Sequence, residues 1–106
     1  MQFDPQATFR ALSDPTRRRI LRILTDGGQT IGQITDQFDV TRPAIKKHLS
    51  ILEQGGLIDV TALGRERINT LKQDGFRPAL NWISDFDGFW DDRLSALKSS
   101  IEKDLN

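Results

Sequence analysis

The chain has 106 residues with 37% hydrophobic and 28% charged residues, which predicts one small globular domain over residues 1–106 and excludes a disordered chain. It contains no cysteine and one histidine, which excludes disulfides, thiolate metal sites and most imidazole chemistry. No run of about 18 apolar residues is present and Met1–Asp4 carries no basic leader, so we expect a cytoplasmic protein with no membrane span, no cofactor and no enzymatic activity.

The first half of the chain carries clear helix signals. A short apolar face comes first, formed by Ala7, Ala11 and Leu12. Asp14 then suits a helix N-cap and Pro15 the first helical position, where a missing N–H has no cost. The helix that follows is predicted to end at Gly27-Gly28 and to bury three residues: Ile20, Leu21 and Leu24.

Two further helices are predicted close together. Thr30 and Gln33 have the spacing of a capping box, which opens a helix with apolar positions at Ile31, Ile34 and Phe38. Only Asp39-Val40 separate this helix from Thr41, which suits the N-cap of the next helix, with Pro43 in its first turn. Two helices joined by so short a turn predict a helix-turn-helix over about residues 30–54.

The pattern then changes from helix to strand. Leu57–Leu63 and Arg67–Leu71 are strand candidates around a turn at Gly64–Glu66, which predicts a hairpin, or wing, over about residues 57–72. A last helix is predicted over about residues 78–104, with Gly88 as a kink or break. Its apolar residues recur every three or four positions: Ile83, Phe86, Trp90, Leu94, Leu97, Ile101 and Leu105. The predicted fold is mainly α with a small antiparallel β-hairpin, a winged helix-turn-helix with a C-terminal dimerisation helix.

The helix over residues 41–54 has two different faces. One side holds Ile45, Leu49 and Leu52 and is predicted to face the core. The opposite side is polar and holds Pro43, Lys46, Lys47 and Ser50, with Arg42 at the amino end. Because a helix fits the major groove of DNA, we expect Arg42 and Lys46 to read guanine and Lys47 to bind base or phosphate. Thr41 and the N–H groups of the first turn are candidates to hold a phosphate.

The charge distribution supports a nucleic-acid partner although the net charge is zero. Residues 1–74 carry eleven Lys/Arg against nine Asp/Glu, whereas residues 75–106 carry four against six. Arg65 and Arg67 of the predicted wing are placed to reach the adjacent backbone or minor groove of DNA. The alternative is a solvated basic surface without a partner, and for Arg17–Arg19 structural packing and phosphate contact both remain open.

Several segments resemble one known family. Residues 11–21 (ALSDPTRRRIL) look like the opening signature of the ArsR/SmtB winged-helix repressors, and residues 41–58 are similar to their recognition helix and first wing strand. Gly64–Arg67 resembles the wing of that family. The tail looks like the metal-independent branch related to the SdpR repressors, on Trp82, Phe89-Trp90 and Leu94–Leu97. The resemblance implies a homodimeric bacterial or archaeal repressor that binds a palindromic operator.

The sequence also departs from that family. Metal sensors of the family carry a cysteine motif on the helix that here spans residues 31–36, and others use Asp/His pairs on the last helix, which here has no histidine. Lysines stand at 46 and 47, where the family often has serine and a variable polar residue, so an operator sequence does not transfer.

Three further features each have two interpretations. His48 is expected to be packed and hydrogen-bonded rather than a ligand, and the acidic group Asp85, Asp87, Asp91 and Asp92 is expected to be solvated rather than a metal site. The apolar tail is expected to pack against its copy in a dimer, through Trp82, Phe86, Phe89, Trp90, Leu94, Leu97 and Ile101. An apolar effector pocket between the subunits is the alternative for this tail.

These observations predict a sequence-specific DNA-binding regulator, a homodimeric repressor of double-stranded DNA sites with an unidentified small-molecule or protein effector. The alternative is a protein-interaction module that keeps the winged-helix fold without binding DNA. No paired carboxylates, nucleophile–base set or phosphate-cradling loop supports an enzyme.

Overall fold

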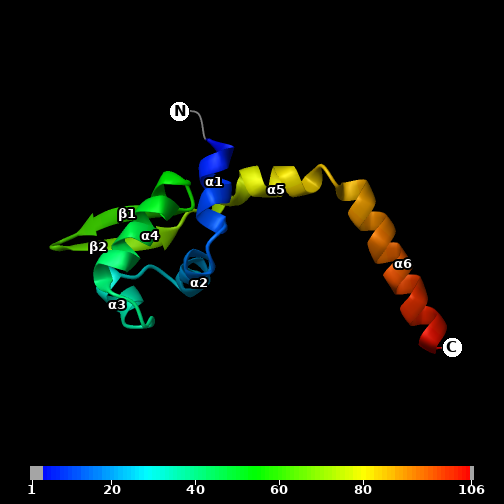
Figure 1. The fold of residues 1–106 in the computed structure, drawn as a ribbon, viewed down its shortest axis with the longest axis horizontal. Helices are drawn as coiled ribbons and strands as arrows, with labels where there is room; N and C mark the ends of the chain where they lie inside the picture. The colour runs from blue at the N-terminus through cyan, green and yellow to red at the C-terminus, as the bar shows by residue number, and fades with distance from the viewer. Residues whose placement is uncertain (1–3, 106) are drawn as a thin grey trace.

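The computed structural model describes residues 4–105, and the side chains of residues 4–103. The sequence predictions also used residues 1–3 and the side chain of Leu105, which lie outside the described residues. The chain is mainly helical with one two-stranded antiparallel sheet, as the sequence predicts, and Figure 1 shows this arrangement.

The first two helices begin where their capping residues stand. Helix α1 spans Pro5–Leu12 after the N-cap Asp4, and α2 spans Pro15–Leu24 after the N-cap Asp14. The Asp14 carboxylate accepts a hydrogen bond from the backbone N–H of Arg17 at 3.0 Å, which satisfies one of the unpaired donors of the first turn. The N-cap predicted at Asp14 is therefore confirmed.

Helices α3 (Ile31–Thr35) and α4 (Arg42–Gln54) form the predicted helix-turn-helix. The capping box is present, because the side chain of Thr30 and the backbone N–H of Gln33 pair at 3.1 Å and the Gln33 side chain accepts from the Thr30 N–H at 2.9 Å. The turn is longer than predicted, however, since α3 ends at Thr35 and does not reach Phe38. The N–H groups of residues 37 and 38 donate to carbonyls three residues back. This is the tighter 3₁₀ pattern, so the α-helix has already ended here.

The wing is a hairpin as predicted, but Glu66, predicted in the turn, is the first residue of its second strand. Strand β1 (Ile58–Leu63) pairs with β2 (Glu66–Leu71), with Ile58 opposite Leu71 and Leu63 opposite Glu66. Gly64 opens the two-residue loop at a φ of 63°, a conformation that residues with a side chain rarely adopt.

A short bridge that the sequence did not predict attaches the wing to the helices. Gln29 pairs with the buried Asn69 of β2: the Asn69 N–H donates to the Gln29 carbonyl at 2.8 Å, and the Gln29 N–H donates back at 3.0 Å. The side-chain amide of Asn69 (Nδ2) also donates to the backbone carbonyl of Gln29 at 3.1 Å. The loop before α3 therefore fixes the base of the hairpin.

The core lies where the helices meet the base of the wing. It is made of buried residues from α1, α2, α3, α4 and the start of β1: Ala11, Ile20, Leu21, Leu24, Ile34, Ile45, Leu49, Leu52, Leu57 and Ile58. Phe38 packs against it from the turn, so its apolar character serves the core although it lies outside α3. This core orients α4, because every apolar residue predicted on the inner side of that helix is buried.

The C-terminal region, predicted as a helix over residues 78–104 with a kink or break at Gly88, contains two helices. A 3₁₀ turn (Gln73–Phe76) leads into α5 (Arg77–Ser84), and α6 spans Asp87–Leu105. The break lies at Asp85–Phe86, while Gly88 lies inside α6. At the break the Phe86 N–H donates to the Ile83 carbonyl, three residues back, and the Phe86 ring meets Trp82 edge to face at 5.1 Å.

The shape of the molecule is extended because α6 leaves the rest of the chain, as Figure 1 shows. The extents are 61 × 34 × 21 Å and the radius of gyration is 18.0 Å, against about 13 Å for a compact chain of this size. Every residue from 80 to 103 is exposed, including the apolar ones. Between residues 4 and 105 no helix has both the length and the apolar character to cross a bilayer.

Candidate DNA interface

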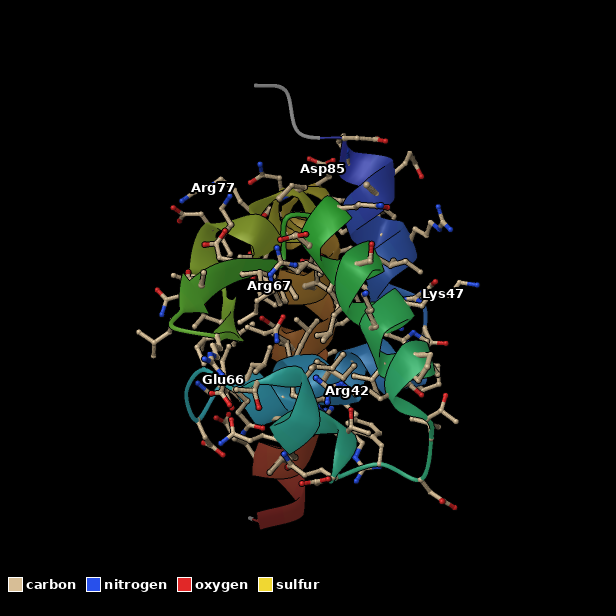
Figure 2. The ribbon with its side chains drawn as sticks, turned by 90° about the vertical axis from the view of Figure 1, so that its left-hand side faces the viewer. Arg42, Lys47, Glu66, Arg67, Arg77 and Asp85 are labelled. Carbon is tan, nitrogen blue, oxygen red and sulfur yellow. The ribbon has the colours of Figure 1, made fainter. Side chains whose placement is uncertain are left out.

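Helix α4 places its basic residues in solvent. Its core side is buried, and Arg42, Pro43, Lys46, Lys47 and Ser50 are all exposed on the remaining surface. Figure 2, which faces the hairpin end of the molecule, shows α4 to the front with Arg42 near its lower end and Lys47 projecting to the side. This arrangement leaves three cationic side chains of one helix free to meet a polyanion.

The amino end of α4 offers fewer hydrogen-bond donors than the sequence suggested. The Thr41 hydroxyl accepts from the Ala44 N–H at 3.3 Å, so that N–H is occupied. Pro43 has no N–H to offer. The donors of the first turn that remain available to a phosphate are thus the Arg42 N–H and the Thr41 hydroxyl. The Arg42 guanidinium is a third donor group at the same end of the helix.

The wing adds two more exposed cations. Arg65 stands in the loop and Arg67 follows on β2, opposite Ala62. Glu66 lies between them and is exposed as well, so the tip carries a net charge of +1. Figure 2 shows the hairpin beside α4 at the same end of the molecule.

Arg17 has a structural role that sequence reasoning left open. Its side chain is only 8% exposed, and its guanidinium bonds to the Ala11 carbonyl at 2.8 Å and to the Arg10 carbonyl at 2.9 Å. The same group lies 3.2 Å from Nδ1 of His48 on α4. Arg17 therefore joins the end of α1, the start of α2 and helix α4, a set of contacts that no spacing rule reveals.

The two neighbouring arginines are also bonded within the molecule. Arg18 donates to the Leu12 carbonyl at 2.8 Å, and Arg19 donates to the Gln37 carbonyl at 3.0 Å. The Arg19 guanidinium also lies 4.5 Å from the centre of the Phe38 ring, a cation–π contact. Arg18 thus supports the junction between α1 and α2, and Arg19 supports the turn before α4.

His48 lies between α4 and α2, as a packed residue. Its Nδ1 faces Arg17, and lies 4.0 Å from Asp14 Oδ2. Partial burial by itself raises the pKa of the Asp14 carboxyl. The hydrogen bond from the Arg17 N–H and the Coulombic interactions with His48 and Arg17 outweigh that effect and hold this pKa below its usual value.

The acidic residues of the tail do not gather into a metal site in the described part of the chain. Among those residues, no group of three or more His, Asp or Glu side chains is placed to hold a metal ion. Asp85, Asp87, Asp91 and Asp92 are all exposed.

Exposed apolar residues between positions 82 and 101 form a stripe along the end of α5, the break and α6. Its members are Trp82, Ile83, Phe86, Phe89, Trp90, Leu94, Leu97 and Ile101. Trp82 is 55% exposed although its ring meets Phe9 of α1 edge to face at 5.9 Å, and Leu94 on α6 is 62% exposed. Single exposed apolar residues are ordinary on protein surfaces, but a contiguous stripe marks an interaction surface.

A helix-turn-helix with a following hairpin and an outward basic helix defines the class of winged helix-turn-helix DNA-binding proteins. Residues 12–61 match a family model described as a helix-turn-helix domain. The transcriptional repressor SdpR of Bacillus subtilis (strain 168) is 37% identical over 78 residues, covering 74% of this chain and 87% of SdpR.

Two other similar proteins span more than four-fifths of this chain. The HTH-type transcriptional regulator Rv2034 of Mycobacterium tuberculosis is 31% identical over 100 residues, covering 94% of this chain and 91% of its own. The crystal structure of an ArsR family transcriptional regulator superposes with a TM-score of 0.73 at 31% identity, covering 81% of this chain and 89% of that one. The chain belongs to the ArsR family of helix-turn-helix transcriptional regulators, and it is not an enzyme.

The lowered pKa of Asp14 gives a prediction about acid stability. A folded-state pKa below the unfolded value of about 3.9 means that the ionised carboxylate stabilises the fold, and this contribution is lost as the pH falls through the folded pKa. Asp14→Asn keeps a capping side chain but removes the charge. The unfolding free energy of the wild type, measured with urea, should therefore exceed that of Asp14→Asn at pH 6 and approach it near pH 3.

Asp14→Ala is the companion variant, because it removes the cap itself and should cost about 0.5–2 kcal/mol at both pH values. Equal differences between the wild type and Asp14→Asn at the two pH values would contradict the assigned role of the Asp14 charge.

Proposed function

We propose that this chain is a homodimeric, metal-independent repressor that binds a palindromic operator, with α4 in the major groove and the wing on the flanking backbone. One observation carries the proposal: the buried apolar side of α4 leaves its cationic side in solvent. In this proposal the contact residues, all of them exposed, are Thr41, Arg42, Pro43, Lys46, Lys47, Ser50, Arg65 and Arg67. The whole chain acts as one domain, in the cytoplasm.

The roles of these residues follow from their chemistry. Arg42 and Lys46 are assigned to the O6 and N7 acceptors of guanine, and Lys47 to a base or a phosphate. Thr41 donates its hydroxyl to a phosphate while its oxygen caps the helix. Arg65 and Arg67 contact the sugar–phosphate backbone beside the wing, or the minor groove.

The proposal of repression without a metal has two supports. SdpR, which is named a transcriptional repressor, is similar to this chain over most of its length. The chain itself contains no cysteine, so the thiolate ligands that divalent metals favour in sensor sites are not available to it. A small molecule or a partner protein remains the candidate effector.

The dimer is proposed from the exposed stripe on α5 and α6. An aromatic side chain that becomes buried removes roughly 150–250 Å² from water, so a stripe with four aromatic rings supplies a strong driving force. The C-terminal helices extend away from the core of their own chain, which leaves a second copy as the partner that would cover them. A twofold axis would then set two α4 helices about 34 Å apart, one turn of DNA.

Substitutions on α4 and on the wing should have different effects on DNA binding. Arg42→Ala or Lys46→Ala should lower the affinity for the preferred duplex by about 5- to 150-fold and relax base preference, because base contacts carry about 1–3 kcal/mol each. Arg65→Ala should weaken binding to all sequences alike. Fluorescence anisotropy on the preferred duplex and on an unrelated duplex separates the two effects.

Lys98→Ala is the matched control, since it removes the same charge from an exposed position on α6. Binding by the α4 variants that equals binding by the wild type would count against the recognition role of α4. A wild type with no affinity for any duplex at low salt would favour the alternative of a protein-interaction module.

A single charge on the stripe should dissociate the dimer. Trp90→Glu places a carboxylate within the proposed interface, where an unpaired charge cannot be hydrated, so the variant should be a monomer by light scattering at micromolar concentration. Ser99→Glu adds the same charge on the opposite side of α6 and should remain a dimer. A wild-type monomer, or a Trp90→Glu dimer, would contradict the assignment of the interface.

A further inference from the structure

A shallow hollow runs along α4 on the side that faces α1. It has a volume of about 460 Å³, and its cationic lining comes from Arg10 of α1 together with Lys46 and Lys47 of α4. Ser50 and Ile51 line it as well. The basic face of α4 therefore continues onto a second helix that the sequence did not connect with it.

The hollow continues toward the start of α1 and changes in charge. A neighbouring depression of about 360 Å³ shares Arg10, Ile51 and Gln54 with the first and ends at Asp4. Arg10 is thus the point where the surface along α1 and α4 turns from cationic to anionic. A polyanion that lies on the cationic part would meet Arg10 as its last positive contact on this side.

The Arg10 guanidinium is available for such a contact. The residue is exposed, and among the described residues its side chain forms no hydrogen bond or ion pair. Three of the four arginines of α2, at positions 17, 18 and 19, instead each bond to backbone carbonyls. Arg10 differs from them in having its cation free.

The backbone of Arg10, by contrast, is firmly held. Its carbonyl accepts hydrogen bonds from the Ser13 N–H at 3.2 Å, the Ser13 hydroxyl at 2.7 Å and the Arg17 guanidinium at 2.9 Å. The position of Arg10 relative to α4 is therefore fixed by the Arg17 link, and only its side chain is left to reach outward.

The arrangement around α4 suggests which part of DNA would occupy the hollow. A helix in the major groove has a phosphate backbone along each of its sides. In Figure 2 the hairpin lies on one side of α4 and α1 lies on the other. The proposed function places the wing on the phosphate backbone along one side of α4. The phosphate backbone along the other side would then lie beside α1 and the hollow.

We propose that Arg10 binds a phosphate of the operator backbone on the side of α4 opposite the wing, so that α1 takes part in DNA binding. The planar guanidinium suits two phosphodiester oxygens, and Lys47 and Ser50 complete the site with a second cation and a hydroxyl. Because a phosphate contact carries no base information, Arg10 contributes affinity and register, not sequence preference. This inference rests on the proposed function.

The test uses the full-length protein and a mixed-sequence duplex of about 30 base pairs, which needs no knowledge of the operator. Affinities of the wild type, Arg10→Ala, Arg10→Gln and Arg10→Lys are measured by anisotropy between about 50 and 200 mM salt. The matched control is Arg22→Ala, because Arg22 is also an exposed arginine in the last turn of its helix and lies outside the hollow.

The log–log salt slope is the decisive readout, since each neutralised phosphate contributes about 0.9 to it. Arg10→Ala and Arg10→Gln should each lower the slope by about 1.8 per dimer and weaken binding severalfold at low salt, while Arg10→Lys and Arg22→Ala should keep the wild-type slope. Circular dichroism should show unchanged folding, because the Arg10 carbonyl is retained in every variant.

The outcomes separate the inference from the function on which it rests. A wild type that binds no duplex overturns both. A wild type that binds normally, with an unchanged slope in Arg10→Ala and Arg10→Gln, overturns the role of Arg10 alone. Equal losses in Arg10→Ala and Arg22→Ala would assign the effect to overall charge and would also overturn it.

Discussion

Burial of one side of α4 determines which of its residues face solvent. Ile45, Leu49 and Leu52 are buried in the core, and each such side chain contributes about 1.5–3 kcal/mol relative to exposure. The helix cannot rotate without exposing these residues and burying lysines, so its cationic side is fixed outward. Arg17 adds a polar restraint, because it holds the end of α1 and faces His48 on α4 at the same time. The proposed DNA contacts are thus consequences of packing on the other side of the helix.

Much of this fold is predictable because its signals are local. Asp14 and Thr41 cap their helices as their residue types and positions predict, since a capping side chain needs only the backbone N–H groups two or three residues ahead. The hairpin is equally local, because alternating residues flank a turn that contains Gly64. The outward placement of Arg42 and the lysines follows from helical periodicity once the helix is known.

The remaining features depend on contacts between distant segments, for which the sequence has no local signal. The bridge between Gln29 and Asn69 joins residues 40 positions apart, and the Arg17–His48 contact joins residues 31 apart. The C-terminal break was assigned to Gly88 on propensity alone, but it lies at Asp85–Phe86, where tight turns and an aromatic contact end α5. Arg10 was likewise not a candidate, because only the packing of α1 against α4 brings it beside the lysines.

Selection of duplexes from a random pool by the purified protein examines binding, symmetry and half-site spacing in one measurement. A dimer that reads DNA through two α4 helices should enrich a palindrome whose half-sites are centred about 10–10.5 base pairs, or a multiple of that, apart. Enrichment of no sequence, or of asymmetric single half-sites by a protein that is dimeric in the same buffer, would contradict the claim that two copies of α4 read DNA together.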